Sequence, residues 1–218
     1  MNSYSNTVKY GAGCTFFEVS PTDPYFQQGR VVTTISAYPD DRKVTSFISY
    51  IREFAEDIEI VTWLAHIIVD CNKTGILNID IEANVVQRQN FELVYGVSRK
   101  SQDLLSVLGS TWIAYPKSKP GIDSGRIDKL KLDLARVATE ALGTVRKEAM
   151  FKKTFKKPPQ VWIALCGINL TCVGDNVRLK TQVVKDSITT TGFNYEIISW
   201  GKTLLETVSL YWLAVELE

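Results

Sequence analysis

The feature that most constrains the fold is an internal repeat, because the second half of the sequence restates the first half in the same order. A repeat of this kind decides the fold class before any local reading does. Two copies are too few for a solenoid, and each is large enough for its own small core. The matched segments are Gly29-Arg30-Val31 with Gly125-Arg126-Ile127, Arg42-Lys43 to Phe47 with Arg146-Lys147 to Phe151, Trp63-Leu64-Ala65 with Trp162-Ile163-Ala164, and Leu104-Leu105 to Trp112-Ile113-Ala114 with Leu204-Leu205 to Trp212-Leu213-Ala214.

The repeat predicts a tandem duplication with two domains. We expect an N-terminal arm at residues 1–28, a first domain at 29–116, a linker at 117–124 and a second domain at 125–218. Prolines and glycine between the copies are typical of a short, fairly stiff linker. The arm carries Phe16, Phe17, Tyr25 and Phe26, so we expect it to pack on the first copy or on a neighbouring subunit.

Alternating apolar residues predict β-strands in both copies. Phe193, Tyr195 and Ile197 alternate with polar residues, which is the period of a half-buried strand. Thr190-Thr191-Gly192 and Trp200-Gly201-Lys202 are short turn signals beside this run. The expected fold is therefore all-β, with two tandem six-stranded antiparallel β-sandwich domains.

Two segments fit more than one pattern. Residues 128–148 and 48–60 place apolar side chains at helical spacing, although both also fit strands. We assign them as strands, because the duplication brings Pro158-Pro159 into their alignment and a helix interior does not tolerate proline.

Composition excludes several classes of function. A net charge of +1 provides no attraction toward nucleic acid or an anionic membrane. No apolar run is long enough to cross a bilayer, and residues 1–15 lack the pattern of a signal peptide. We therefore expect a cytoplasmic or unconventionally secreted protein, with no nucleic-acid partner and no membrane insertion.

Cofactor and enzyme signatures are also missing from the sequence. Cys14, Cys71, Cys166 and Cys172 are not equivalent between the copies, and Cys166 and Cys172 have no histidine nearby, so we expect neither a metal nor another cofactor. The single histidine, His66, lies in an apolar run and is interpreted as buried or at an interface. No nucleophile motif or phosphate loop occurs, and the expected protein is not an enzyme.

The second copy carries the more informative polar and aromatic residues. Trp200 is predicted at a hairpin tip beside Gly201 and Lys202, and Arg178 lies on a predicted strand. An exposed indole can stack on the apolar face of a sugar, and a guanidinium can donate several hydrogen bonds to hydroxyls. The competing interpretation is that Trp200 packs over its own sheet.

In order and spacing, the second copy resembles the H-type lectins, a family that includes snail agglutinins and the carboxy-terminal part of slime-mould discoidins. The resemblance covers residues 125–218. It rests on Phe151 to Phe155, Pro158-Pro159-Gln160-Val161, Asn176-Val177-Arg178, Thr190-Thr191-Gly192-Phe193, Ser199-Trp200-Gly201 and Val208 to Ala214. It implies a six-stranded antiparallel sandwich that forms trimers or hexamers and binds galactose or N-acetylgalactosamine without metal, at sites where protomers meet.

By this resemblance Arg178 and Trp200 take the places of the family's sugar-binding arginine and tryptophan. Gly201 stands where snail proteins have a sugar-contacting histidine, and Glu140 is the acidic residue nearest to the family's aspartate. The first copy keeps scaffold residues, namely Phe47, Asn78, Phe91 and Trp112. It has Asp80 in place of the arginine, Ser98 or Arg99 in place of the tryptophan, and Asp40-Asp41 near the place of the aspartate.

Each copy thus holds part of a site, which leads to the hypothesis of a composite site. Asp40 or Asp41 would face Arg178 and Trp200 across a repeat or subunit interface, although a simple interface ion pair explains the same residues. The leading interpretation is a lectin that presents galactose-type sites multivalently to glycans or glycoproteins as a homo-oligomer. The alternative is a duplicated structural or cell-adhesion module that has lost sugar binding.

Overall fold

The computed structural model describes residues 9–11, 25–35, 42–70, 73–131, 143–172, 178–200 and 204–217, and these form a nearly all-β molecule. A short strand β1 (Lys9–Gly11) precedes the two halves. The first half contains β2 (Gln27–Thr34), β3 (Arg42–Ser49), β4 (Ile58–Val69), β5 (Gly75–Asn84), β6 (Asn90–Val97), the helical turn α1 (Arg99–Gln102) and β7 (Leu105–Pro116). The second half contains β8 (Ile122–Lys131), β9 (Gly143–Met150), β10 (Gln160–Cys172), β11 (Leu179–Val183), the turn η2 (Lys185–Ser187), β12 (Gly192–Ser199) and β13 (Leu204–Val215).

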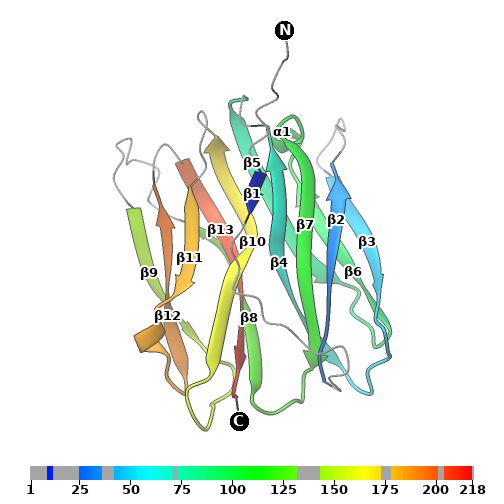
Figure 1. Ribbon diagram of the computed structural model, residues 1–218, viewed down its shortest axis with the longest axis vertical. Helices are drawn as coiled ribbons and strands as arrows, with labels where there is room; N and C mark the ends of the chain where they lie inside the picture. Colours follow the sequence, from blue (N-terminus) through cyan, green and yellow to red (C-terminus); the bar gives the residue numbers. More distant parts are fainter. Residues whose placement is uncertain are drawn as a thin grey trace.

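The described strands form three antiparallel sheets, shown in Figure 1. One sheet has the order β1-β4-β7-β2, a second has β3-β6-β5-β10-β13-β8, and a third has β11-β12-β9. The second sheet runs through both halves, because β5 pairs directly with β10. The prediction of an all-β fold built from antiparallel sheets is confirmed.

The two halves arrange their strands in the same way. In each half the sixth strand pairs between the first and the third, so that β2-β7-β4 matches β8-β13-β10. The fifth strand pairs between the second and the fourth, so that β3-β6-β5 matches β9-β12-β11. Both long pairs carry a bulge at the corresponding place, at Leu64/His66 in one half and Leu165/Gly167 in the other. The domain limits themselves stay a prediction.

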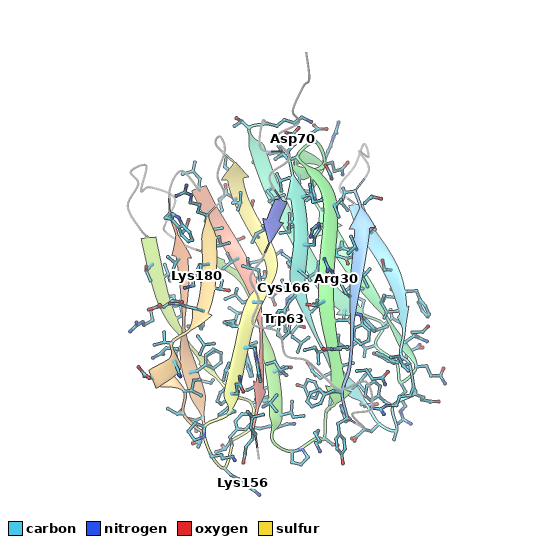
Figure 2. All side chains as sticks on the ribbon, in the orientation of Figure 1. Arg30, Trp63, Asp70, Lys156, Cys166 and Lys180 are labelled. Atoms are coloured by element: carbon cyan, nitrogen blue, oxygen red, sulfur yellow. The ribbon has the colours of Figure 1, made fainter. Side chains whose placement is uncertain are left out.

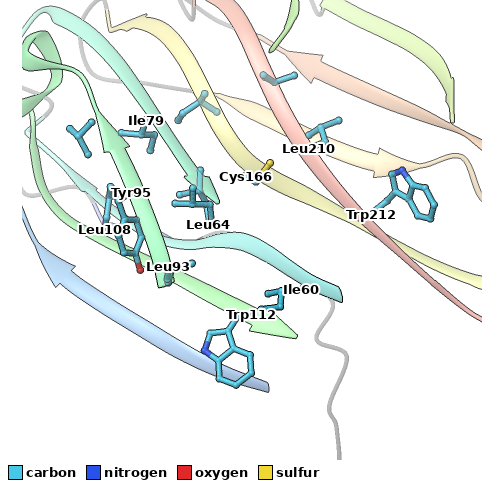
Figure 3. Close-up of a cluster of buried hydrophobic side chains, with 14 of the residues drawn as sticks. Ile60, Leu64, Ile79, Leu93, Tyr95, Leu108, Trp112, Cys166, Leu210 and Trp212 are labelled. Atoms are coloured by element: carbon cyan, nitrogen blue, oxygen red, sulfur yellow. The ribbon is translucent and has the colours of Figure 1, made fainter. Parts of the chain in front are cut away.

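Each half is centred on four aromatic side chains with nearly the same geometry. In the first half Tyr50 stacks on Phe91 at 5.7 Å and meets Phe54 edge-on at 5.1 Å. In the second half Phe151 stacks on Phe193 at 5.6 Å and meets Phe155 edge-on at 4.9 Å. Trp112 and Trp212, labelled in Figure 3, close the two clusters. Aromatic pairs at these separations favour such tilted arrangements.

Glycine permits this packing at the first strand of each half. A side chain at Gly29 would approach the indole of Trp112 to 2.6 Å, and one at Gly125 would approach that of Trp212 to 2.5 Å. The indoles therefore lie directly on the backbone of β2 and β8. This close packing explains why the repeated Gly-Arg pair of the sequence has glycine at its first position in both halves.

Two alignments inferred from the sequence are wrong. Phe47 does not match Phe151, because the strand register places Tyr50 there, and the side chain of Phe47 is 65% exposed. Trp63 does not match Trp162, because Thr62 and Ile163 are the residues that pair with Trp112 and Trp212. The errors arise because a residue of similar type lies two or three positions away from the residue that the strand register makes equivalent.

The ambiguous segments are strands in part. Within them residues 48–49, 58–60, 128–131 and 143–148 are strands as predicted, but residues 50–57 form an irregular connection. That connection is held by backbone bonds from Tyr50 N to Gln89 O and from Phe54 N to Arg88 O. Tyr50 and Phe54, which lie four residues apart in this segment, both turn into the core. Their separation explains why the segment has apolar residues at helical spacing. Residues 132–142 lie outside the described part of the chain.

The halves are packed against each other and are not separated by a free linker. Phe26, Val61, Trp63, Ile113 and Tyr115 of the first half form a cluster with residues of β8, β10 and β13. Trp63, near the centre of Figure 2, donates its Nε1–H to the carbonyl oxygen of Tyr211 at 2.9 Å. Residues 122–124 of the predicted linker already belong to β8, and only 117–121 form a turn.

The end of the predicted N-terminal arm packs on the first half. Phe26 is buried, with its ring 6.1 Å from that of Tyr115. Lys119 lies 3.2 Å from the ring centroid of Tyr25, a cation–π contact with the turn between the halves. Phe16 and Phe17 lie outside the described residues.

Candidate functional site

The structure brings Arg178 and Trp200 together at the same end of two adjacent strands. Arg178 directly precedes β11 and Trp200 directly follows β12, and these strands are paired. The backbone N–H of Trp200 donates to the carbonyl oxygen of Arg178 at 3.3 Å. Arg178 is exposed and Trp200 is half-buried.

Side-chain hydrogen bonds link the strands beside Arg178 and Trp200 to their neighbour β9. On the exposed face of the third sheet, Glu196 accepts hydrogen bonds from Arg146 and from Gln182, the latter at 2.8 Å. The hydrogen bond from Gln182, followed by that from Arg146, lowers the pKa of Glu196. The carboxylate stays ionised and links β9, β12 and β11 side by side.

Five other predicted site residues lie outside the described part of the chain: Asp40, Asp41, Glu140, Gly201 and Lys202. The strand that follows Asp40-Asp41 is β3, which is an edge of the six-stranded sheet, whereas Arg178 lies beside β11, an edge of the third sheet. Figure 1 shows these two strands on opposite sides of the molecule. A site that combines the aspartates with Arg178 stays a prediction.

The strand register corrects the residues assigned to the first half. Ser98 N donates to Asn78 O at 3.1 Å, which is the counterpart of the bond from Trp200 to Arg178. Asn78 therefore occupies the place of the arginine and Ser98 that of the tryptophan. The assignment of Asp80 to the arginine position is wrong, because the register aligns Asp80 with Lys180.

Asp80 instead forms an ion pair between the halves. Arg126 on β8 places Nη2 at 2.7 Å from Oδ2 of Asp80 and donates from Nη1 to the carbonyl oxygen of Ile81 at 3.0 Å. Burial raises the pKa of Asp80, and the charge of Arg126 opposes that rise. The sequence contained no signal for this pair, because the residues come from strands that are not neighbours.

The described residues offer little for catalysis or metal binding. Among them no group of three or more histidine, cysteine, aspartate or glutamate side chains could hold a metal ion. His66 is half-buried on β4, in line with its interpretation as a packed histidine. Burial raises the pKa of the Cys166 thiol, which favours the unreactive protonated form.

No helix in the described parts of the chain is long and apolar enough to span a membrane.

The described strands define a β-sandwich protein with an exposed arginine and a half-buried tryptophan at adjacent strand ends. Residues 146–215 match the H-type lectin domain family, and this part of the chain is an H-type lectin domain. The resemblance seen in the sequence is thereby confirmed for the second half. A lectin domain is a carbohydrate-binding domain, and the matched range contains both Arg178 and Trp200.

The structure is also similar to two structures of discoidin II from Dictyostelium discoideum, a native recombinant form and a wild-type form. The TM-score is 0.39 in both comparisons, with 13% and 14% sequence identity. The alignments cover 79% of this chain and 77% and 76% of the other chains. Comparison with curated protein sequences gives no match.

Proposed function

We propose that the protein is a non-enzymatic lectin whose second half binds a galactose- or N-acetylgalactosamine-type sugar between Arg178 and Trp200. The observation that carries the proposal is the hydrogen bond between Trp200 N and Arg178 O, which fixes both residues at one end of β11 and β12. The accessible part of the indole stacks on the apolar face of the sugar. The guanidinium donates to its hydroxyl oxygens or to a ring substituent.

Multivalency is part of the proposal, because a single shallow sugar site binds weakly. Several sites held in fixed geometry increase the overall affinity without any new contact. We propose a homo-oligomer, trimeric or hexameric, that presents the Arg178–Trp200 sites to glycans or glycoproteins. Sedimentation analysis tests this point, since a monomer at working concentration contradicts it.

A glycan array tests the sugar site directly. The wild-type chain is expected to bind galactose-type glycans, whereas Trp200→Ala and Arg178→Ala each lose most of that signal. Phe47→Ala and Arg30→Ala are matched controls, because they remove an exposed aromatic ring and an exposed arginine elsewhere. Unchanged binding in both site variants would overturn the proposal.

One observation favours a second candidate function, a structural or adhesion module. The first half has Asn78 and Ser98 in place of Arg178 and Trp200, so it keeps the sandwich without the proposed sugar-contacting side chains. If the wild-type chain binds no glycan on a broad array, that result would support the structural or adhesion function. Agglutination of cells that free N-acetylgalactosamine inhibits would exclude it.

A further inference from the structure

A cleft of about 720 Å³ opens where the two halves join. It lies at the seam of the six-stranded sheet, where β5 of the first half pairs with β10 of the second. The first half lines it with one apolar residue, Ile76, and with Asn78, Ser98, Arg99 and Lys100, and the second half contributes Asn169 and Glu206. The volume lies within the range of small-molecule sites.

The floor of the cleft is built from both halves. Asn78 and Asn169 face each other directly in the β5–β10 ladder, and Asn169 donates from Nδ2 to Oε2 of Glu206 at 2.8 Å. Ser101 Oγ accepts the backbone N–H of Asn78 at 2.7 Å and lies 2.8 Å from Oγ of Ser98. These bonds hold the backbone at Asn78 and the side chains of Asn169 and Glu206 in place before any ligand arrives.

The lining combines acceptors for hydroxyl groups with cations at the rim. The exposed amide of Asn78 and the exposed carboxylate of Glu206 can accept hydrogen bonds from vicinal hydroxyls, which makes the floor suitable for a sugar ring. Arg99 and Lys100 are both exposed at the cleft, and Glu206 is the acidic residue among the described residues that line it. A ligand that bears hydroxyls and one anionic group satisfies both parts of the lining.

We propose that this inter-half cleft is a second saccharide site, selective for acidic saccharides that carry a carboxylate or a sulfate. Among the residues that line it there is no aromatic side chain, so it cannot stack a neutral sugar as Trp200 would. Specificity comes from Arg99 and Lys100 on the anionic group and from Asn78 and Glu206 on the hydroxyls, with Asn169 orienting Glu206. The proposal goes beyond the Arg178–Trp200 site and does not depend on it.

The test measures binding of lactose, sialyllactose and sulfated lactose to the full chain by isothermal titration calorimetry. Sialyllactose, sulfated lactose or both are expected to bind to the wild type at the cleft. The double variant Arg99→Glu, Lys100→Glu is expected to weaken that binding at least about tenfold, and higher salt weakens it in the wild type. Lys185→Glu, which changes an exposed charge on η2, is the matched control and leaves binding unchanged.

Trp200→Ala separates the two proposals, because it leaves binding of the acidic saccharides in place while removing that of neutral sugars. The cleft proposal is overturned if neither acidic ligand binds the wild type. It is also overturned if the double variant, shown to be folded by its melting temperature, binds them as tightly as the wild type does. The two acidic ligands distinguish carboxylate from sulfate recognition.

Discussion

Arg126 of the second half and Asp80 of the first half form an ion pair across the face of the continuous six-stranded sheet, with Nη2 and Oδ2 2.7 Å apart. The pair spans β10 and β13, the two strands that separate β8 from β5. The side chain of Arg126 is only 16% exposed. Together with the β5–β10 ladder, this pair ties the halves into one unit.

Removing the arginine should destabilise the whole chain. Arg126→Ala leaves the half-buried carboxylate of Asp80 without its partner and frees the carbonyl of Ile81, so we expect a loss of about 2–3 kcal/mol. Arg30→Ala is the matched control, because Arg30 follows Gly29 as Arg126 follows Gly125 but is exposed. Urea unfolding of both variants measures the difference, and equal stabilities would contradict the role of the pair.

The loss in Arg126→Ala should depend on pH. Burial raises the pKa of Asp80 above its usual 3.8, and the rise is larger once the opposing charge of Arg126 is gone. A carboxyl whose pKa is raised on folding costs stability when ionised, and this cost disappears below the unfolded pKa. The deficit relative to wild type is therefore largest at neutral pH and shrinks toward pH 3.8. Unfolding curves measured across this interval check it, and a constant deficit would argue against it.

Gly167 leaves room for the Asp80 side chain. It pairs with Asp80 in the β5–β10 ladder, and a Cβ there would collide with Oδ1 of Asp80 and lie 3.1 Å from Cβ of Ser209. Gly167→Ala is expected to cost about 1–3 kcal/mol through this crowding. Gly96→Ala, whose added carbon meets nothing closer than 3.8 Å, should change the melting temperature little. Two variants of equal stability would refute the steric argument.

Gly29 and Gly125 should respond alike to substitution. Alanine at either place drives a methyl group into the indole of Trp112 or Trp212, which are buried in their aromatic clusters. We expect each variant to lose about 1–3 kcal/mol, and by similar amounts in the two halves. Calorimetric melting compares them, and a large loss in one variant beside none in the other would contradict the structural correspondence of the halves.

The sequence predicts the strands and the turn signals well, because alternation and glycine positions are local. It also identifies Arg178 and Trp200, which the paired ends of β11 and β12 bring together. It misplaces Phe47 and Asp80, because matching residue types in two copies is not the same as matching strand register. The ion pair of Arg126 and the cleft at Asn78 and Asn169 depend on how one half pairs with the other. No local pattern encodes that pairing.

The central claim is sugar binding at Arg178 and Trp200, and titration of N-acetylgalactosamine by isothermal calorimetry tests it most directly. The wild-type chain should bind the sugar, and Trp200→Ala should lose at least about tenfold in affinity, equivalent to about 1.4 kcal/mol. Phe47→Ala should bind as the wild type does, since that exposed ring lies on β3. Equal affinity in the wild type and in a folded Trp200→Ala variant, or no binding by the wild type, would contradict the account.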